Sequence, residues 1–599
     1  MIQELWPPFD ARLLLRRRKA YLRDLRQRAG LLPLRIAVLG GWTSEEVVNL
    51  LELFLLERGI SPEFYQSDYN RYYEEAVLDP SSLEAFRPQI VYIHTASVNL
   101  RRYPPSSATE SEFKAALRGE MERWEQIWSS LDSRLGCQLI QNNFDPVAGV
   151  LGNLDASSWG GRGHFVARMN IELAGHARAN KRLLIHDLHG VATQLGRDQW
   201  AAPERWYSYK LVTTAQGSGA LAYSLAALIG AVVGKSRKCL ILDLDNTLWG
   251  GVIGDDGLEH IHLGRETPQG EAFTAFQEYC LELHRRGVLL AVCSKNEEEI
   301  ARTGFQHPDS VLRLDHFAAI CANWEPKSEN IKAIAAQLNL GLDALVFVDD
   351  NPAERELIRA QLPEVAVPEV GSEVSRFADI LNDGGYFEPV ALSQEDLERG
   401  RLYATNAERH TMQARYADYG EYLQALEMTA EISPFRPAYL DRIAQLTNKT
   451  NQFNLTARRY NRAELEHMAA DPQFLTFAGH LRDRFGDNGL VSVVIGRKDG
   501  RRLHLDLWLM SCRVLKRDME AAMLDALVER ASAAGIKEMI GYYQRTSKND
   551  MVAEHYARLG FTRFAAEDPA GEASEWRLSL EEGYHPRNRY IRSEEISDV

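Results

Sequence analysis

Short apolar segments alternate with helical ones over the first two thirds of the chain, and this alternation limits the possible folds more than any other feature. The apolar segments read RIAVLGG (35–41), IVYIH (90–94), QLIQNNF (138–144), LLIHDL (183–188), CLILDLD (239–245), VLLAVCS (288–294) and ALVFVDD (344–350). Buried strands separated by helices are typical of three-layer α/β domains with a mostly parallel sheet. A short basic linker, GKSRKC, divides the series, so the sequence predicts two such domains, at residues 31–234 and 235–389.

The remaining segments follow other patterns. Residues 390–430 are charged and indicate a helical linker. Residues 431–585 predict an α+β domain, in which antiparallel strands, including a hairpin that turns at Lys498-Asp499-Gly500, are followed by a helix, a strand, a helix and a strand. Residues 586–599 are expected to form a polar tail.

Residues 1–30 predict a basic N-terminal helix. Between positions 11 and 28 there are eight arginines and lysines and one acidic residue, Asp24, while Leu14, Tyr21, Leu22 and Leu25 form a partial helical stripe. Two interpretations remain open. The helix either packs on the first domain with its charges solvated, or it provides a docking site for an acidic partner.

Composition excludes several functional classes. A net charge of −15 argues against general nucleic-acid binding. The longest apolar stretch, residues 220–233, is too short to span a bilayer and predicts a buried helix, and no signal peptide is apparent at the N-terminus. The six cysteines form no Cys-x-x-Cys pair and no zinc-type spacing, which indicates free thiols in a reducing compartment. We therefore expect a cytoplasmic protein with no membrane or nucleic-acid partner.

The segment LDLDNT at residues 242–247 predicts a nucleophilic site. Open α/β sheets bind their ligands at the carboxyl ends of the strands, and Asp243 and Asp245 lie at such an end. Asp243 can attack phosphorus to form an aspartyl-phosphate. Asp245 can protonate the leaving oxygen and then activate water. Asn246 and Thr247 are expected to hold the turn and contact the substrate.

Three further segments carry polar residues at strand ends or helix starts. Ser294-Lys295-Asn296 follows a strand, and its hydroxyl and neighbouring amides can bind phosphoryl oxygens. Lys327 precedes a helix and can neutralise the phosphoryl group. Asp349-Asp350 closes another strand.

These carboxylates predict a magnesium site, because hard cations prefer oxygen ligands. The expected ligands are Asp243, Asp245, Asp349 and Asp350. A single Asp-x-Asp motif could simply cap a helix, but the ordered set of Asp-x-Asp, Ser, Lys and Asp-Asp favours magnesium-dependent phosphoryl transfer.

The four motifs resemble those of the haloacid-dehalogenase (HAD) superfamily. More narrowly, LDLDNTLWGGVIGDDG (242–257), VCSKN and NWEPKSEN are similar to the FkbH-like family, and the resemblance covers nearly the whole chain. It implies a HAD-like Rossmannoid core, preceded by an SGNH-like α/β domain and followed by a GNAT-like α+β domain.

The resemblance also implies a reaction. Family members capture D-1,3-bisphosphoglycerate, a small phosphorylated C3 metabolite, move its acyl group to an enzyme thiol, remove phosphate and pass the glyceryl group to an acyl carrier protein for polyketide or related biosynthesis. Cys293, beside Ser294, is the first candidate for that thiol, and Cys512 is the second. The alternatives are a simple Mg²⁺-dependent phosphatase, and a carrier-binding protein with a vestigial site.

The flanking domains depart from the families they resemble. In the GNAT-like domain, lysine and aspartate stand in segment 513–518 where glycines of a pyrophosphate loop are expected, so acetyl-CoA catalysis is not expected. Arg513, Lys516 and Arg517 instead suit an acidic carrier or its pantetheine arm. The SGNH-like domain has no Gly-Asp-Ser motif, and Asp187-Leu188-His189 has the wrong spacing for its Asp-x-x-His. We therefore expect a degenerate scaffold in which Ser44 caps a helix.

Overall fold

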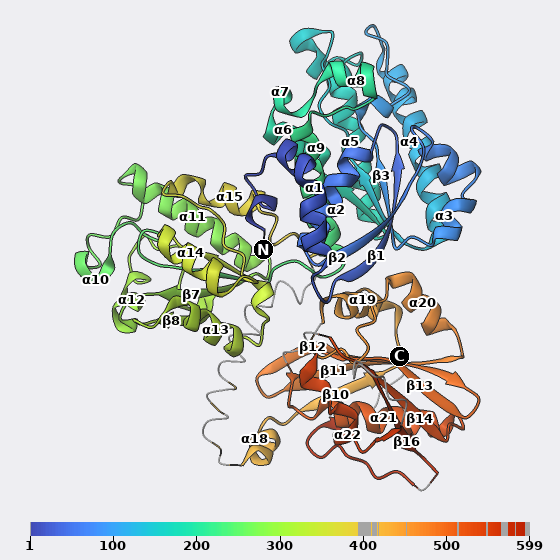
Figure 1. The fold of residues 1–599 in the computed structure, drawn as a ribbon, viewed down its shortest axis with the longest axis vertical. Helices are drawn as coiled ribbons and strands as arrows, with labels where there is room; N and C mark the ends of the chain where they lie inside the picture. Colours follow the sequence, from blue (N-terminus) through green and yellow to red (C-terminus); the bar gives the residue numbers. More distant parts are fainter. Residues whose placement is uncertain are drawn as a thin grey trace. The chain divides into compact units, whose positions relative to one another are not determined.

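The computed structural model describes residues 2–392, 409, 412, 416, 418–450, 452–511, 514–546, 549–564, 573–581 and 583–593 (Figure 1). The chain divides at about Val233 into two compact units. The second unit contains two separate sheets, so three parts are described below, each by itself.

The N-terminal unit contains a five-stranded, fully parallel sheet in the order β2-β1-β3-β4-β5 (Figure 1). Its strands are β1 (Leu32–Gly40), β2 (Ile60–Gln66), β3 (Ile90–His94), β4 (Gln138–Asn142) and β5 (Leu183–His186). Its α-helices are α1 (Ala11–Arg26), α2 (Glu45–Glu57), α3 (Ser81–Phe86), α4 (Glu110–Leu135), α5 (Arg162–Ala179), α6 (Leu188–Leu195), α7 (Arg197–Trp200), α8 (Pro203–Tyr209) and α9 (Ala215–Val232). The α/β domain expected from the alternating pattern is confirmed.

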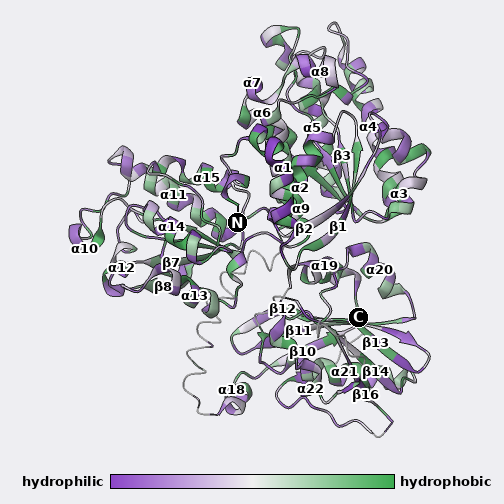
Figure 2. Ribbon diagram, viewed as in Figure 1, coloured by the Kyte–Doolittle hydropathy of each residue, from purple (hydrophilic) through white to green (hydrophobic). Residues whose placement is uncertain are grey.

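Helix α1 packs on this unit through its apolar residues. Asp10 caps the helix by accepting hydrogen bonds from the amides of Arg12 and Leu13, and Leu14, Leu22 and Leu25 are buried. Helix α9 is the one described helix whose length and composition would allow a membrane span. However, 72% of it is buried inside the unit, as in a core helix. In Figure 2, hydrophilic and hydrophobic residues alternate along many helices, as expected for helices with one buried side.

The second part is a four-stranded parallel sheet in the order β8-β7-β6-β9. The strands are β6 (Cys239–Leu242), β7 (Leu289–Ser294), β8 (Phe317–Ala322) and β9 (Leu345–Val348). The helices are α10 (Ile253–Asp256), α11 (Pro268–Arg285), α12 (Glu298–Gly304), α13 (Lys327–Gln337), α14 (Pro352–Gln361) and α15 (Phe377–Asp383). Each strand is wholly or largely buried, and three of the four end where a motif residue begins, which brings the motifs to one edge of the sheet.

The third part is built on an eight-stranded mixed sheet in the order β15-β16-β14-β13-β12-β11-β10-β17. The strands are β10 (Thr429–Ser433), β11 (Phe474–Asp483), β12 (Gly486–Asp499), β13 (Arg502–Met510), β14 (Glu538–Gln544), β15 (Thr562–Phe564), β16 (Ala573–Ser579) and β17 (Arg592–Ser593). The helices are α18 (Tyr419–Ala425), α19 (Leu440–Lys449), α20 (Arg462–Ala470), α21 (Met519–Ala533) and α22 (His555–Arg558). Helix α21 connects β13 to β14, which run parallel, while β10 to β13 are antiparallel. This is the GNAT-like order of elements expected from the sequence.

Residues 586–593, the described part of the expected polar tail, differ from that expectation. Within residues 586–593, Ile591 is buried and β17 pairs with β10. The carboxylate of Asp525 accepts hydrogen bonds from the amides of Arg587 and Asn588. One buried apolar residue and a half-buried acceptor are enough to add this segment to the sheet edge. Most of the expected linker at 390–430 lies outside the described residues.

Candidate active site

The carboxyl edge of the β8-β7-β6-β9 sheet brings together side chains from four separate motifs. Asp243 follows β6, Ser294 ends β7, Asp349 follows β9, and Lys327 is the first residue of α13. The amide of Asp243 donates to the carbonyl oxygen of Val348, at 3.0 Å, so the ends of β6 and β9 are held together. Parallel strands end at the same edge, which explains why residues up to 106 positions apart in sequence meet.

Lys327 lies between two carboxylates. Its Nζ is 3.0 Å from Asp243 Oδ1 and 2.5 Å from Asp349 Oδ2, and all three side chains are buried. Burial alone would lower the pKa of Lys327, but Asp243 and Asp349 outweigh it and raise that pKa. Burial raises the pKa of Asp243 to about 6; the lysine opposes this rise and Asp349 adds to it. The ammonium group therefore stays charged beside the nucleophile.

Three carboxylates at this edge suit a divalent cation. Oxygen atoms of Asp243, Asp349 and Asp350 all lie within 4.8 Å of one another. Lys327 forms ion pairs with Asp243 and Asp349, so the three carboxylates and the ammonium group together carry a net charge of −2 when ionised. An all-oxygen donor set with this excess of charge fits Mg²⁺.

Asp245, expected among the metal ligands, is not part of this group. Its Oδ1 accepts hydrogen bonds from Trp249 Nε1 and from the amide of Ile253, both at 3.0 Å, and its Oδ2 accepts one from Asn296 Nδ2 at 2.8 Å. Three donors therefore orient the carboxylate, which suits an acid–base group better than a side-chain metal ligand.

The other motif residues support the site or lie at its rim. Ser294 and Asn296 are buried, and Asn296 Nδ2 also lies 3.3 Å from Ser294 Oγ. Thr247 is buried, and its Oγ1 accepts a hydrogen bond from the amide of Asp350 at 3.1 Å. Thr247 therefore positions the loop that carries the expected metal ligands Asp349 and Asp350. Asn246 has φ +55° and accepts from the amide of Gly251. Lys295 pairs with Glu354.

Sequence reasoning did not identify Trp249. Its indole is fully buried, packs edge-on against Phe305 and donates to Asp245. A Cβ on Gly304 would lie 2.5 Å from this ring, so the glycine makes room for it. The sequence signal for this contact was a tryptophan placed four residues after Asp245 and directly before two glycines.

The structure corrects the expected role of Cys293 as acyl carrier. Successive side chains of a strand point to opposite faces, so Cys293 points away from the face that Ser294 uses. Its thiol is fully buried among apolar residues, and its Sγ donates to the carbonyl oxygen of Lys327 at 3.7 Å. Burial raises its pKa, which disfavours the reactive thiolate. Cys512, the second candidate, lies outside the described residues.

The expected carrier-binding arginines are corrected in part. Arg517 is buried, and its Nη1 lies 3.0 Å from Asp483 Oδ2, while Arg409 pairs with the other oxygen of Asp483 at 2.8 Å. Burial lowers the pKa of Arg517 to about 10. This arginine belongs to an internal ion-pair network and is not available to a partner. Lys516 is exposed, and Arg513 lies outside the described residues.

In the GNAT-like domain, β13 and β14 pair only from Arg502 to Leu505 on β13, and the gap beyond is filled by the chain itself. Leu455 N donates to Trp508 O, and Met510 N donates to Phe453 O, on the β13 side. On the β14 side, Gln544 N donates to Leu455 O. The segment 453–455 therefore bridges the two strands, with Asn454 in an isolated β-bridge to Leu509.

At the carboxyl edge of the N-terminal sheet, aromatic and amide groups lie at the point where the strand order reverses, between β1 and β3. Ligands of open α/β sheets bind at such points. Trp42 follows β1, and its ring centre lies 4.0 Å from that of His94 at the end of β3; both side chains are buried. Asn99 donates to the carbonyl oxygen of Gly41. Ser44 stands at the N-cap of α2 but makes no capping bond, which corrects the expected role; its hydroxyl contacts Gln66.

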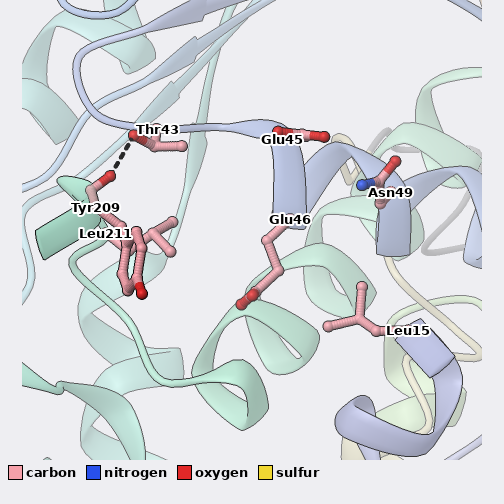
Figure 3. A pocket seen from close by; sticks show the side chains of 7 residues that line it. All are labelled: Leu15, Thr43, Glu45, Glu46, Asn49, Tyr209 and Leu211. Carbon is pink, nitrogen blue, oxygen red and sulfur yellow. Dashed lines mark hydrogen bonds between the residues drawn. The ribbon is translucent and has the colours of Figure 1, made fainter. Parts of the chain in front are cut away.

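A pocket of about 360 Å³ lies nearby, at the start of α2 (Figure 3). Leu15 of α1, Glu45, Glu46 and Asn49 of α2, and Thr43 line it (Figure 3). Glu46 already pairs with Arg205, and Thr43 donates to the carbonyl oxygen of Tyr209. Two of the polar side chains that line the pocket are therefore already engaged within the unit.

Comparisons with known proteins agree with this description. Residues 35–223 match the family model of the FkbH N-terminal domain. The N-terminal part of protein BF1531 from Bacteroides fragilis, which contains a phosphatase domain complexed with Mg, is 29% identical, with a TM-score of 0.58 over 62% of this chain and 99% of that one.

Acetyltransferases resemble the chain more distantly. The ribosomal-protein-S18-alanine N-acetyltransferase from Escherichia coli is 14% identical, with a TM-score of 0.21 over 26% of this chain and 100% of that one. The chain has no match among the curated proteins. Residues 35–223 thus match the FkbH N-terminal domain, and the parallel β8-β7-β6-β9 sheet that follows in the same chain has a HAD-like fold.

Proposed function

We propose that this protein is a cytoplasmic, Mg²⁺-dependent phosphatase and glyceryl transferase that uses D-1,3-bisphosphoglycerate and loads a glyceryl unit on an acyl carrier protein. The observation that supports it most is the placement of Lys327 between Asp243 and Asp349, next to Asp350. This arrangement combines a carboxylate nucleophile, a cation for phosphoryl charge and an oxygen-only metal site. Magnesium, when bound, screens the repulsion between the nucleophile and an anionic phosphate.

The phosphatase step uses two carboxylates. Asp243 attacks phosphorus of the phosphate ester, and the P–O bond to the substrate breaks as Asp245 gives its proton to the leaving oxygen. Asp245, now ionised, takes a proton from water, which attacks the aspartyl-phosphate and restores Asp243. The sum is one water consumed, one alcohol formed and one inorganic phosphate released. Lys327 stabilises the charge on the transferred group.

The transfer step uses the other end of the substrate. A thiolate attacks the carbonyl carbon of the acyl phosphate, phosphate leaves with the bonding electron pair, and a thioester forms. Because Cys293 is buried with a raised pKa, we assign the accepting thiol to the carrier and not to this cysteine. No cap domain separates the site from solvent among residues 246–326, where only the short α10 flap intervenes between core elements, so a carrier-borne thiol has access.

Mass analysis of the carrier tests the proposal. Incubation of the protein with Mg²⁺, bisphosphoglycerate and a thiol-bearing carrier should add one glyceryl group to the carrier and release two phosphates. The Asp243→Asn variant should still bind substrate but should not release phosphate from the ester.

The second candidate function is a simple phosphatase. The burial of Cys293 favours it, because a buried thiol with a raised pKa is a poor acceptor for an acyl group. Phosphate release with an unmodified carrier at every carrier concentration would select this alternative. A wild-type protein inert with Mg²⁺ would instead select a carrier-binding protein with a vestigial site.

A further inference from the structure

Trp324 is an exposed aromatic residue beside the catalytic edge. It lies in the loop between β8 and α13, three residues before Lys327. Its side chain is 71% exposed, which makes it the most exposed of the chain's eleven tryptophans. Tryptophan is usually well buried, so an indole this exposed at the carboxyl edge of the sheet is a candidate contact for a ligand.

The loop that carries Trp324 is fixed to the site. The amide of Asn323 donates to the carbonyl oxygen of Ser294, at 3.1 Å. The side-chain amides of Asn323 and Asn330 exchange two hydrogen bonds, of 3.2 and 2.8 Å, and Asn323 also accepts from the amide of Glu325. The indole is therefore presented by a rigid loop, which reduces the entropy lost when it binds a ligand.

The flap across the site offers a second exposed apolar residue. Val252 is 38% exposed and precedes Ile253, whose amide donates to Asp245. The carboxylate of Asp256 holds the amide of Val252 at 2.8 Å, so this side of the rim is also fixed. Asp243 itself is only 7% exposed. A reactive group must therefore enter deeply, past the exposed loops that follow β6 and β8.

We propose that Trp324 binds the pantetheine arm of the carrier at the mouth of this site and so determines specificity for the acceptor thiol. This inference rests on the proposed function. A pantetheine arm is long enough to reach inward and consists of methylene groups and amides, which pack well against an indole face. An indole carries no group for phosphoryl transfer, and the proposed function assigns that chemistry to Asp243, Ser294 and Lys327.

Two variants and a matched control test the proposal. Trp324→Ala removes the indole, and Trp324→Phe keeps an aromatic face. Tyr207→Ala removes an aromatic side chain that is 79% exposed in the N-terminal unit. Each is assayed for glyceryl transfer to the carrier, transfer to free pantetheine, and phosphate release without an acceptor. Binding of pantetheine is measured separately by calorimetry, which needs no turnover.

Trp324→Ala should raise KM about tenfold or more for both the carrier and pantetheine, as for loss of a central aromatic contact. Phosphate release should stay within twofold, Trp324→Phe should recover most of the affinity, and Tyr207→Ala should behave as wild type. An effect on the carrier alone would place the contact on the carrier's surface and overturn the proposal. A parallel loss of phosphate release would overturn it too, by showing a role in the catalytic loop. If pantetheine binds through Trp324 but wild type transfers no glyceryl group, the proposed function fails and this inference stands.

Discussion

The hydrogen bond from Trp249 to Asp245 predicts a measurable loss of acid–base catalysis in Trp249→Phe. The phenyl ring keeps most of the packing against Phe305, but it removes one of the three donors that orient the carboxylate. A hydrogen bond to a charged group contributes about 1.5–3 kcal/mol. At about 1.4 kcal/mol per factor of ten, kcat should fall about 10- to 150-fold. This loss is smaller than, or at the lower end of, the 10²–10⁴-fold that positioned acids and bases contribute, as expected when the acid is misplaced and not removed.

Phosphate release at saturating Mg²⁺ gives the assay, with an alkyl and an aryl phosphate as substrates. An aryl leaving group needs little protonation, so the loss in the first step should be smaller for the aryl phosphate. Phe305→Leu is the control, because it disturbs the same packing and leaves the indole donor in place. If Trp249→Phe keeps kcat within threefold for both substrates, the assignment of Asp245 as an acid oriented by Trp249 is wrong.

Three further predictions concern stability and accessibility. Burial lowers the pKa of His94 to about 3 and of His186 to about 4, so stability is complete above pH 6.5 and falls as the pH drops toward these values. Between pH 7 and pH 5 each histidine should lower the free energy of unfolding of the N-terminal unit by about 2 kcal/mol, and His94→Gln should remove about half of the total loss. Alkylation of Cys137 in urea measures unfolding of this unit. An unchanged pH dependence in His94→Gln would contradict the prediction. Magnesium should raise the melting temperature of wild type and not of Asp349→Ala, measured by calorimetry with Ca²⁺ as a comparison; equal shifts in both would place the ion elsewhere. Iodoacetamide should leave Cys293 unmodified in the native protein, and Cys293→Ala should retain phosphate release; rapid labelling would restore this cysteine as a candidate acyl carrier.

Local patterns were sufficient to predict the parallel sheets and the residues at their carboxyl edge. The segment CLILDLD required a buried strand that ends in carboxylates, and two similar segments required the same geometry, so Asp243, Ser294 and Asp349 had to meet. The GNAT-like domain followed from the order of its strands and helices.

The wrong predictions share a physical cause: they depend on the direction in which a side chain points and on its contacts with residues distant in sequence. Whether Cys293 or Ser294 faces the site depends on the pleat of β7, which sequence neighbours do not reveal. The hydrogen bonds that distinguish Asp245 from the metal-site residue Asp350 come from the amide of Ile253 and from Asn296, and neither bond could be predicted from the sequence. Arg517 resembled a surface charge until Asp483 and Arg409 were seen beside it.

The bridging segment at residues 453–455 adds a free-energy cost for any ligand that would enter the gap between β13 and β14. Such a ligand must first displace a segment held by three backbone hydrogen bonds and by Asn549 Nδ2, which donates to the carbonyl oxygen of Asn454 at 2.9 Å. At about 1 kcal/mol for each bond, displacement costs about 4 kcal/mol and weakens apparent affinity about 1,000-fold. Removing this segment should therefore open the gap between β13 and β14 to a ligand.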